Sequence, residues 1–343
     1  MIKAGIVGAT GYAGLELVRI LSLHPEVGIA ALSSVSFEGK RLSEIYPALL
    51  GIRDDRLSSQ DGIEDCCDVV FAALPHGLSQ PIAARCAAKG RLFIDLGADF
   101  RLESESEHEK WYGGGFDDRA LHESAVYGLC EINRERIKEA RLIANPGCYP
   151  TSAVLGLWPV LSLGLCGADG IIIDAKSGVT GAGRALNQNT HYPELNEGFS
   201  PYKAGTHRHM PEIEQTLSKI AGREVRVTFV PHLLPVNRGI VSTMYLRKNG
   251  RSLDEIRGAY REFYEGERFI RVLGEGACAN LKNVRMSNLC DISLHEDAHT
   301  DTLIVVSAID NMVKGAAGQA VQNMNIALGI DEAAGLFMIP PAF

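Results

Sequence analysis

The stretch that decides the fold is residues 4–22, AGIVGATGYAGLELVRILS. Its first four residues have the character of a buried strand, and apolar residues recur with a helical period after Gly14. A glycine turn between strand and helix lets the backbone approach a pyrophosphate, and the helix N-terminus offers free amides. The spacing is G-x-x-G-x-x-G instead of the standard G-x-G-x-x-G, and a turn of this kind can also simply close a strand–helix corner. We expect a cofactor-binding turn formed by Gly8, Thr10, Gly11, Tyr12, Ala13 and Gly14.

The first half of the chain continues to alternate strand-like and helical patterns. The further candidates are strands at 27–33, 68–74 and 91–95 and a helix at 80–89. Such alternation predicts an α/β domain with a Rossmann-type, doubly wound parallel sheet. The segment 103–116 is acidic and then glycine-rich, which indicates a surface loop.

The second half has strand candidates with few helical crossovers, so we expect an α/β domain with a mixed, largely antiparallel sheet. The candidates are 170–175, 224–230, 239–246, 291–294 and 302–309. Helices are expected at 152–161, 212–220, 253–264 and about 315–328. Ser252 followed by Glu255 predicts a capping box at the start of the third of these.

Length and composition limit the class of protein. The 343 residues suffice for about two domains. With 46% hydrophobic residues and a net charge of −8, the chain is neither disordered nor suited to nucleic acid. It shows no secretory signal and no apolar run long enough to span a bilayer, so a cytoplasmic location is expected. None of the eight cysteines forms a C-x-x-C pair, and most are expected to be buried.

Two features of the first half bear on the nicotinamide cofactor. The second strand ends without the Asp or Glu of an NAD site, and instead Ser33, Ser34, Lys40 and Arg41 follow. Hydroxyls and cations suit a 2′-phosphate, so we expect NADP, although the two cations can equally be ordinary surface charges. Leu74, Pro75 and His76 end a predicted strand, where they either lie against the nicotinamide or form a plain turn.

The sequence ANPGCYPT (144–151) places Cys148 before an apolar helix. A cysteine at a helix N-terminus has a lowered pKa and more thiolate, which is the nucleophilic form. The tight Pro-Gly turn before it can expose the sulfur. We therefore expect Cys148 to be a nucleophile, whereas a buried structural cysteine is the alternative.

Histidines that can serve such a nucleophile occur in GTHRHMPE (205–212). His207 or His209 can act as the base, with Glu212 orienting one of them. A metal site that adds His191 or His232 is an alternative, but no spacing completes it and none is expected. The loop after the strand at 170–175 can wrap a ring or phosphate with Ser177, Gly178 and Gly181, and Arg184 can hold an anionic oxygen.

With these motifs the sequence resembles the semialdehyde dehydrogenase family, in particular its arginine-biosynthesis branch. The resemblance runs along the whole chain. The matching stretches are 8–14, 74–77, 95–102 (DLGADFRL), 125–134 (AVYGLCEINR), 144–151, 176–184, 205–215 and 310–323 (DNMVKGAAGQAVQN). Two departures are Cys130, where the family usually has proline, and Gly97, where it usually has serine.

The resemblance implies an NADP-binding Rossmann domain at 1–147, to which a C-terminal helix at about 315–343 returns, and a catalytic and oligomerisation domain at 148–314. It implies homodimers or homotetramers. It also implies NADPH-dependent reduction of N-acetyl-L-glutamyl 5-phosphate to the 5-semialdehyde, with release of phosphate, through a Cys148 thioester. His209 or His207 is the implied acid/base. Arg101, Asn145 and Arg184 are implied at the substrate, and Asn311 and Lys314 near the cofactor.

The sequence also allows three other interpretations of its function. The same chemistry could act on a carrier-protein-linked aminoadipyl or glutamyl phosphate, or on aspartyl phosphate. A non-catalytic NADP-binding regulator would have no reason to keep Cys148 and the histidines. A metal-dependent hydrolase would predict bound zinc.

Overall fold

The structure is a computed structural model that describes residues 1–342. The chain divides into two compact units. Unit 1 consists of Met1–Pro146 and Ala316–Phe337, and unit 2 consists of Gly147–Gly315 and a short segment from Met338 onward. Each unit is described by itself below.

Unit 1 is built on a six-stranded sheet in which every pair of neighbours is parallel, in the order β2-β1-β3-β4-β6-β5. The strands are β1 (Ile2–Val7), β2 (Val27–Ser33), β3 (Val69–Ala72), β4 (Leu92–Asp95), β5 (Val126–Tyr127) and β6 (Leu142–Ala144). Because β2 lies on one side of β1 and β3 on the other, the strand order reverses at β1. Ligands of open α/β sheets bind at such a point, outside the carboxyl ends of the strands. The predicted fold class is confirmed.

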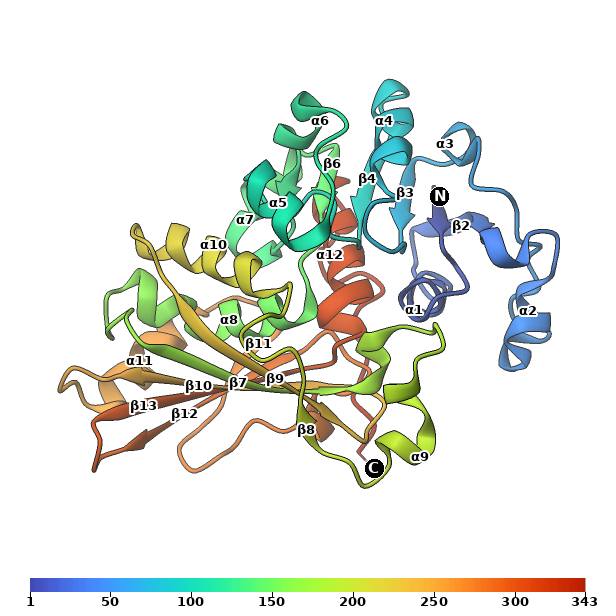
Figure 1. Ribbon diagram of the computed structural model, residues 1–343. Coiled ribbons are helices and arrows are strands. Elements are labelled where there is room, and N and C mark those ends of the chain that lie inside the picture. The colour runs from blue at the N-terminus through green and yellow to red at the C-terminus, as the bar shows by residue number, and fades with distance from the viewer. Residues whose placement is uncertain (343) are drawn as a thin grey trace. The chain divides into compact units, whose positions relative to one another are not determined.

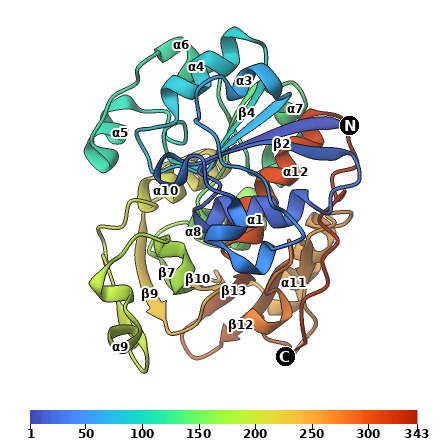
Figure 2. The same ribbon diagram turned by 90° about the vertical axis from the view of Figure 1, so that its right-hand side faces the viewer.

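Short helices connect these strands. They are α1 (Tyr12–Leu21), α2 (Leu42–Ile45), α3 (Ile63–Cys66), α4 (Gln80–Ala88), α5 (Glu105–Tyr112), α6 (Arg119–Glu123) and α7 (Cys130–Lys138), with 3₁₀ turns at Val35–Phe37 and Pro47–Leu49. The late helix α12 (Gly318–Ala327) packs against α1, α7 and β4, so a segment from late in the chain completes this unit (Figure 2).

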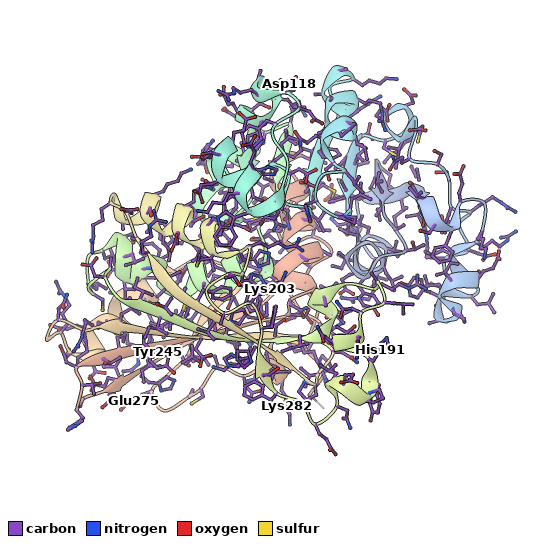
Figure 3. The ribbon with its side chains drawn as sticks, in the orientation of Figure 1. Asp118, His191, Lys203, Tyr245, Glu275 and Lys282 are labelled. Carbon is purple, nitrogen blue, oxygen red and sulfur yellow. The ribbon has the colours of Figure 1, made fainter. Side chains whose placement is uncertain are left out.

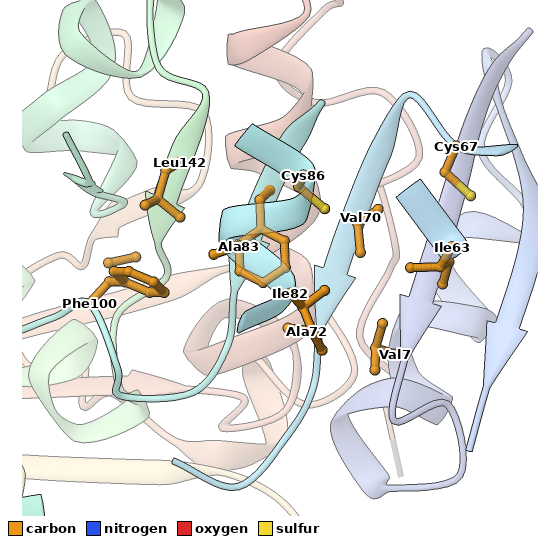
Figure 4. Close-up of a cluster of buried hydrophobic side chains, with 12 residues drawn as sticks. Val7, Ile63, Cys67, Val70, Ala72, Ile82, Ala83, Cys86, Phe100 and Leu142 are labelled. Atoms are coloured by element: carbon orange, nitrogen blue, oxygen red, sulfur yellow. The ribbon is translucent and has the colours of Figure 1, made fainter. Parts of the chain in front are cut away.

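A cluster of buried apolar side chains fixes β1, β3 and β4 relative to α3 and α4 (Figure 4). Val7, Val70, Ile82 and Phe100 are each at most 5% exposed. Burying a side chain of this size contributes about 1.5–3 kcal/mol. This packed core therefore fixes the positions of β1, β3 and β4. The predicted cofactor residues lie at the carboxyl ends of these strands.

The prediction that residues 103–116 form a surface loop is wrong, because they contain the helix α5. Ser104 caps this helix by accepting a hydrogen bond from the Glu107 amide at 3.3 Å, and Gly113 ends it with a φ of 80°. The acidic residues Glu105 and Glu107 occupy its first turn, where the helix dipole favours negative charge. The acidic composition that suggested a loop is the signature of a helix start.

Unit 2 contains a seven-stranded mixed sheet in the order β11-β12-β13-β10-β7-β9-β8, in which most neighbours are antiparallel, as predicted. The strands are β7 (Ile171–Gly178), β8 (Ser200–Pro201), β9 (Val227–Leu234), β10 (Ile240–Arg247), β11 (Ile270–Val272), β12 (Cys290–Asp297) and β13 (Thr302–Ile309). The helices are α8 (Cys148–Ser162), α9 (Tyr192–Leu195), α10 (Met210–Ala221) and α11 (Leu253–Phe263), with 3₁₀ turns at Val179–Ala182, Gln188–Thr190 and Leu281–Asn283.

The helix α8 covers one face of this sheet, packing on β10 and β13 and beneath α10 (Figure 1). It begins at Cys148 rather than at Ser152, one turn earlier than predicted. Pro150 lies in this first turn, where its missing N–H would have had no intrahelical partner. The apolar pattern that predicted this helix starts later than α8 itself, because the first turn of α8 consists of residues of the ANPGCYPT motif and not of the apolar run that follows.

Two local predictions have definite outcomes. The capping box of α11 is confirmed, since Ser252 Oγ accepts a hydrogen bond from the Glu255 amide at 3.2 Å. The helix expected at 315–328 is preceded by a π-helical turn, Val313–Ala317, before α12 begins.

Across residues 1–342, no helix has both the length and the hydrophobicity needed to cross a bilayer.

Candidate active site

The three glycines of the turn after β1 have different roles. Two are required by the packing around them, and one leaves room for a ligand. A Cβ at Gly8, whose φ is +83°, would lie 2.4 Å from the Ala73 carbonyl oxygen, and one at Gly14 would lie 2.2 Å from that of Gly8. The packing of strands and helix therefore requires both glycines. A Cβ at Gly11 would meet nothing nearer than 3.4 Å. Gly11 is the N-cap of α1, so the first-turn amides have no side-chain cap and can bind an anion.

The residues expected near a 2′-phosphate lie around this turn. The Ser33 carbonyl accepts hydrogen bonds from the amides of Gly8 and Ala9, each at 3.0 Å. The Ser33 hydroxyl is fully buried and makes no hydrogen bond within the described chain. Ser34 Oγ lies 2.8 Å from Thr10 Oγ1. The end of β2 is thus fastened to the glycine turn.

The two cations differ in their surroundings. The Arg41 guanidinium forms an ion pair with Asp54 at 2.5 Å. Lys40 is exposed, with its ammonium 5.7 Å from the centroid of the Phe37 ring. Of the two cations, Lys40 is therefore the more available to bind a phosphate.

The loop after β3 lies beside the glycine turn, because the Ala73 amide donates to the Val7 carbonyl at 2.9 Å and Gly8 packs on Ala73. Leu74, Pro75 and His76 belong to this loop. The His76 ring meets the Tyr112 ring edge-on, with centroids 5.5 Å apart. Unit 1 therefore brings the predicted cofactor residues after β1, β2 and β3 to the carboxyl edge of its sheet. An uncapped helix start beside hydroxyls and an exposed cation fits a dinucleotide with a 2′-phosphate.

Cys148 is the first residue of α8 and is partly buried. The cap before it, Gly147, donates its amide to Glu212 Oε1 at 2.8 Å, and Glu212 is fully buried. Glu212 belongs to α10, so this hydrogen bond ties the start of α10 to the start of α8. That Glu212 orients a histidine stays a prediction; its contact with Gly147 shows that it orients the turn that carries the cysteine.

The two candidate histidines have different environments. His207 is 7% exposed, and its Nδ1 accepts a hydrogen bond from the His209 amide at 3.1 Å. Burial, with a smaller effect of the nearby cations Lys203 and Arg208, lowers the pKa of His207 to about 4 (Lys203 is labelled in Figure 3). His207 is therefore a neutral imidazole with its proton on Nε2. His209, the N-cap of α10, is half-buried.

Tyr149, which sequence reasoning did not select, joins these groups. Its ring packs edge-on against His207 at 5.4 Å and His209 at 6.0 Å between centroids. Its hydroxyl lies 3.1 Å from that of Tyr202. Burial raises the pKa of Tyr202 to about 12 and that of Tyr149 further, so both keep their protons at neutral pH. The position of Tyr149 directly after Cys148 was the available signal. Unit 2 thus assembles Cys148, Tyr149, His207, His209 and Glu212 at the starts of two helices.

The loop after β7 is ordered by Asn311. Asn311 Oδ1 accepts from the Gly239 amide at 2.7 Å, and its Nδ2 donates to Thr180 Oγ1 at 3.0 Å. Ser177 donates to the Gly178 carbonyl, and Gly181 lies against Asn311 and Ser177. Asn311 therefore shapes this loop, while Arg184 at its end is exposed.

Three other predicted site residues have structural partners. Arg101 donates to the carbonyls of Asn145 and Leu96, each at 2.8 Å. Asn145 donates to the Ala316 carbonyl and accepts from Asn323, which fastens α12 to unit 1. Lys314 is fully buried, with its ammonium 5.6 Å from the Phe269 ring centroid.

The histidines of the metal alternative are placed differently. His232 Nδ1 lies 3.2 Å from Asp174 Oδ1, and its ring stacks on Phe199, whereas His191 caps the short helix α9. In the described part of the chain, no three His, Cys, Asp or Glu side chains are grouped so that they could hold a metal ion.

Comparison with known proteins agrees with the division of the chain into two compact units. Residues 3–140 match the model of the semialdehyde dehydrogenase NAD-binding domain, and residues 148–311 match that of the semialdehyde dehydrogenase dimerisation domain. The chain belongs to the semialdehyde dehydrogenase family. This family member has curated relatives called N-acetyl-gamma-glutamyl-phosphate reductase in Clostridium beijerinckii (57% identical) and Brachyspira hyodysenteriae (55% identical), and both matches cover the whole of each chain.

Solved structures show the same fold at low sequence identity. Aspartate semialdehyde dehydrogenase II from Vibrio cholerae, complexed with ASA, has a TM-score of 0.73 at 18% identity, and the match covers 96% of this family member and 98% of that chain. The Candida albicans aspartate semialdehyde dehydrogenase with NADP has a TM-score of 0.69 at 20% identity, with coverage of 95% and 98%.

Gly315→Ala tests the packing around the cysteine. A Cβ at 315, in the π-helical turn, would lie 2.8 Å from the Cys148 Cβ and 3.3 Å from its Cα. Cys148 must shift, and displacement of a reacting group by about 1 Å can cost roughly 10²-fold in rate. We expect kcat to fall by about that factor while NADPH binding is kept. The matched control is Gly258→Ala in α11, where a Cβ meets nothing within 4 Å. Equal activity of both variants would contradict the expectation.

The neutral state of His207 predicts a pH dependence of stability. The folded pKa of about 4 lies below the ordinary value of about 6.5, so the unfolded chain binds this proton more tightly. Stability therefore falls as the pH drops from about 6.5 towards 4, by up to about 3 kcal/mol from this group. His207→Asn, which keeps an acceptor for the His209 amide, should reduce the difference between the unfolding free energies at pH 7.5 and 4.5. Urea titrations with identical pH dependence in both proteins would refute this.

Proposed function

We propose that this chain reduces N-acetyl-L-glutamyl 5-phosphate with NADPH, giving N-acetyl-L-glutamate 5-semialdehyde and phosphate. The observation that carries the proposal is the position of Cys148 at the first residue of a long helix, fixed by Glu212 through the Gly147 amide and followed by Tyr149, whose ring packs against two histidines. The proposed substrate is supported by relatives called N-acetyl-gamma-glutamyl-phosphate reductase, which are 48–57% identical along the whole of both chains.

The proposed chemistry divides the reduction into two steps. The Cys148 sulfur attacks the acyl carbon, the C–O bond to phosphate breaks, and a thioester forms. NADPH, when bound, supplies a hydride to the thioester carbon. The resulting oxyanion collapses and releases the aldehyde and the cysteine sulfur. The backbone amides at the start of α8 are suited to stabilise the oxyanion, because a helix N-terminus presents N–H groups to a developing negative charge.

The two histidines take different roles in this proposal. His209 transfers the proton to and from the reacting oxygen and sulfur. His207 accepts the His209 amide and stays neutral, so it positions its neighbour. Tyr149 packs against both rings and holds them beside the start of α8.

For NADP we propose the Gly8–Gly14 turn, the hydroxyls of Ser33 and Ser34 and the cations Lys40 and Arg41, with Leu74, Pro75 and His76 beside the nicotinamide. Ser177, Gly178, Gly181, Asn311 and Lys314 are assigned to cofactor contacts or to the loop that makes them. Arg101, Asn145 and Arg184 are assigned to the substrate. These roles are proposals, and Lys40 is favoured over Arg41 because the Arg41 guanidinium is paired with Asp54.

A second copy of the chain is the proposed partner. The face of the large sheet opposite α8 carries Ile172, which is 44% exposed, and the partly exposed Thr243 and Tyr245 (Tyr245 is labelled in Figure 3). Together with the match to a dimerisation domain, this face supports a homodimer, or a homotetramer built from dimers. A cytoplasmic location is kept as the expectation from sequence.

The reaction is best tested in reverse, because the acyl phosphate is unstable. The protein is mixed with N-acetylglutamate semialdehyde, phosphate and NADP, and NADPH is followed by its absorbance. Parallel mixtures replace the substrate with aspartate semialdehyde, the cofactor with NAD, or omit phosphate. We expect phosphate-dependent NADPH formation with the acetylated substrate alone. Activity only with another semialdehyde would overturn the substrate, and activity without phosphate would overturn the acyl-phosphate chemistry.

A further inference from the structure

Two fully buried carboxylates lie where β4 ends, within the DLGADFRL stretch, and the proposed function uses neither. Asp95 is the last residue of β4, and Asp99 follows four residues later. A buried acidic side chain needs hydrogen bonds to offset its loss of hydration. The partners of these two carboxylates therefore indicate what each one does.

Both oxygens of Asp99 accept hydrogen bonds from the backbone of one loop. Oδ1 accepts from the Gly77 amide at 2.5 Å, and Oδ2 accepts from the Ser79 amide at 2.8 Å. Gly77 has a φ of +85°, and a Cβ there would meet nothing within 4 Å, so packing does not hold this turn. The carboxylate of Asp99 thus restrains the backbone of the loop that joins β3 to α4 at two amides.

Asp95 makes a different set of contacts. Its Oδ1 accepts from the Ser79 hydroxyl at 2.7 Å and from the Gly97 amide at 2.9 Å. Its Oδ2 is buried and has no hydrogen-bond partner among residues 1–342. Burial, with the nearby charge of Asp99, raises the pKa of Asp95 to about 6. Asp95 holds a side chain of the loop, whereas Asp99 holds its backbone.

The loop in question lies at the point where the strand order of unit 1 reverses. Its first residue, Ala73, contacts the glycine turn, since Gly8 packs on the Ala73 carbonyl. Loops at such positions bind ligands but are mobile unless something restrains them. Restraining a loop in its bound conformation raises affinity because less order has to be gained on binding.

We propose that Asp99 is a positioning residue: by binding the Gly77 and Ser79 amides it holds residues 74–79, before the cofactor arrives, in the conformation that receives the nicotinamide half of NADPH. This inference rests on the proposed function, because it assumes that the loop borders the cofactor. It assigns Asp99 no contact with the substrate.

The experiment compares Asp99→Asn with Asp95→Asn, two isosteric changes of adjacent buried carboxylates. An asparagine at 99 can accept only one of the two amides and turns an NH₂ group towards the other. We expect the Kd for NADPH, measured by fluorescence, and the KM for NADP to rise roughly tenfold or more, since hydrogen bonds to charged groups carry that weight. We expect kcat and the KM for the semialdehyde to change less than about threefold. An asparagine at 95 keeps both acceptor contacts, so its Kd should stay within about threefold of wild type.

Three results would overturn the proposal. The first is an unchanged Kd in Asp99→Asn, the second is an equal rise in both variants, and the third is a fall in kcat without a change in KM. Wild-type protein that binds no NADPH would instead overturn the proposed function, which separates the two failures. If Asp99→Asn does not fold, hydrogen exchange in the wild type decides. The Gly77 and Ser79 amides should be protected without cofactor, and protection that appears only with NADPH would overturn the proposal.

Discussion

Replacing Cys148 by serine should lower the phosphate-dependent rate to below roughly 0.1% of wild type while the Kd for NADPH stays unchanged. The reason is chemical. A helix N-terminus favours the thiolate form of a cysteine, whereas a serine hydroxyl at the same place stays protonated and is a poor nucleophile. The change from sulfur to oxygen is small, and Cys148 is only partly buried, so folding should be unaffected.

The matched control for this variant is Cys278→Ser. Cys278 is also a free cysteine of unit 2, but it is exposed and lies outside the proposed site. It should keep full activity. Activity of Cys148→Ser within tenfold of wild type would rule out a covalent intermediate on this residue. Loss of NADPH binding in the same variant would show that the substitution damages more than the nucleophile.

His209→Ala should reduce kcat by about 10²–10⁴-fold, the usual contribution of a positioned acid or base. The structure separates His209 from His207. The Nδ1 of His207 is occupied by the His209 amide, and its lowered pKa keeps the ring neutral. His209 is half-buried and caps α10, so its side chain can be removed without opening the core.

The comparison that tests this assignment is His207→Asn, which keeps an acceptor for the His209 amide. We expect a clearly smaller loss of kcat than in His209→Ala. The pH–rate profile of His209→Ala should also lose one limb, because a proton-transfer group has been removed. A loss of less than tenfold in His209→Ala, or a larger loss in His207→Asn, would reverse the two roles.

The architecture of unit 1 is largely readable from the sequence. Strand and helix periodicities are local, so 4–7, 27–33 and 91–95 are recognised from the residues alone. The short strands β5 and β6 were missed, since runs of two or three residues carry no period. The helix α5 was missed for a related reason, because half of its eight residues are charged and only its caps, Ser104 and Gly113, define it.

In the candidate site too, short motifs predict some features, whereas contacts between distant segments decide others. The motifs that contain Cys148, His207 and His209 are short and distinctive, so the residue types and the reaction class follow from them. The difference between the two histidines does not, because it depends on the burial of one ring and on how the backbone turns between them.

The sequence by itself predicted most of the longer strands and helices and the groups that carry the proposed chemistry, because hydrophobic periodicity and turn motifs depend on neighbouring residues. Only the tertiary structure decided that Glu212 holds the Gly147 amide and that Asp99 holds the loop after β3. The first pair lies 65 residues apart and the second 20 to 22. Such hydrogen bonds exist only once helices and strands have packed, because packing brings a buried carboxylate to unpaired amides that no local pattern can connect.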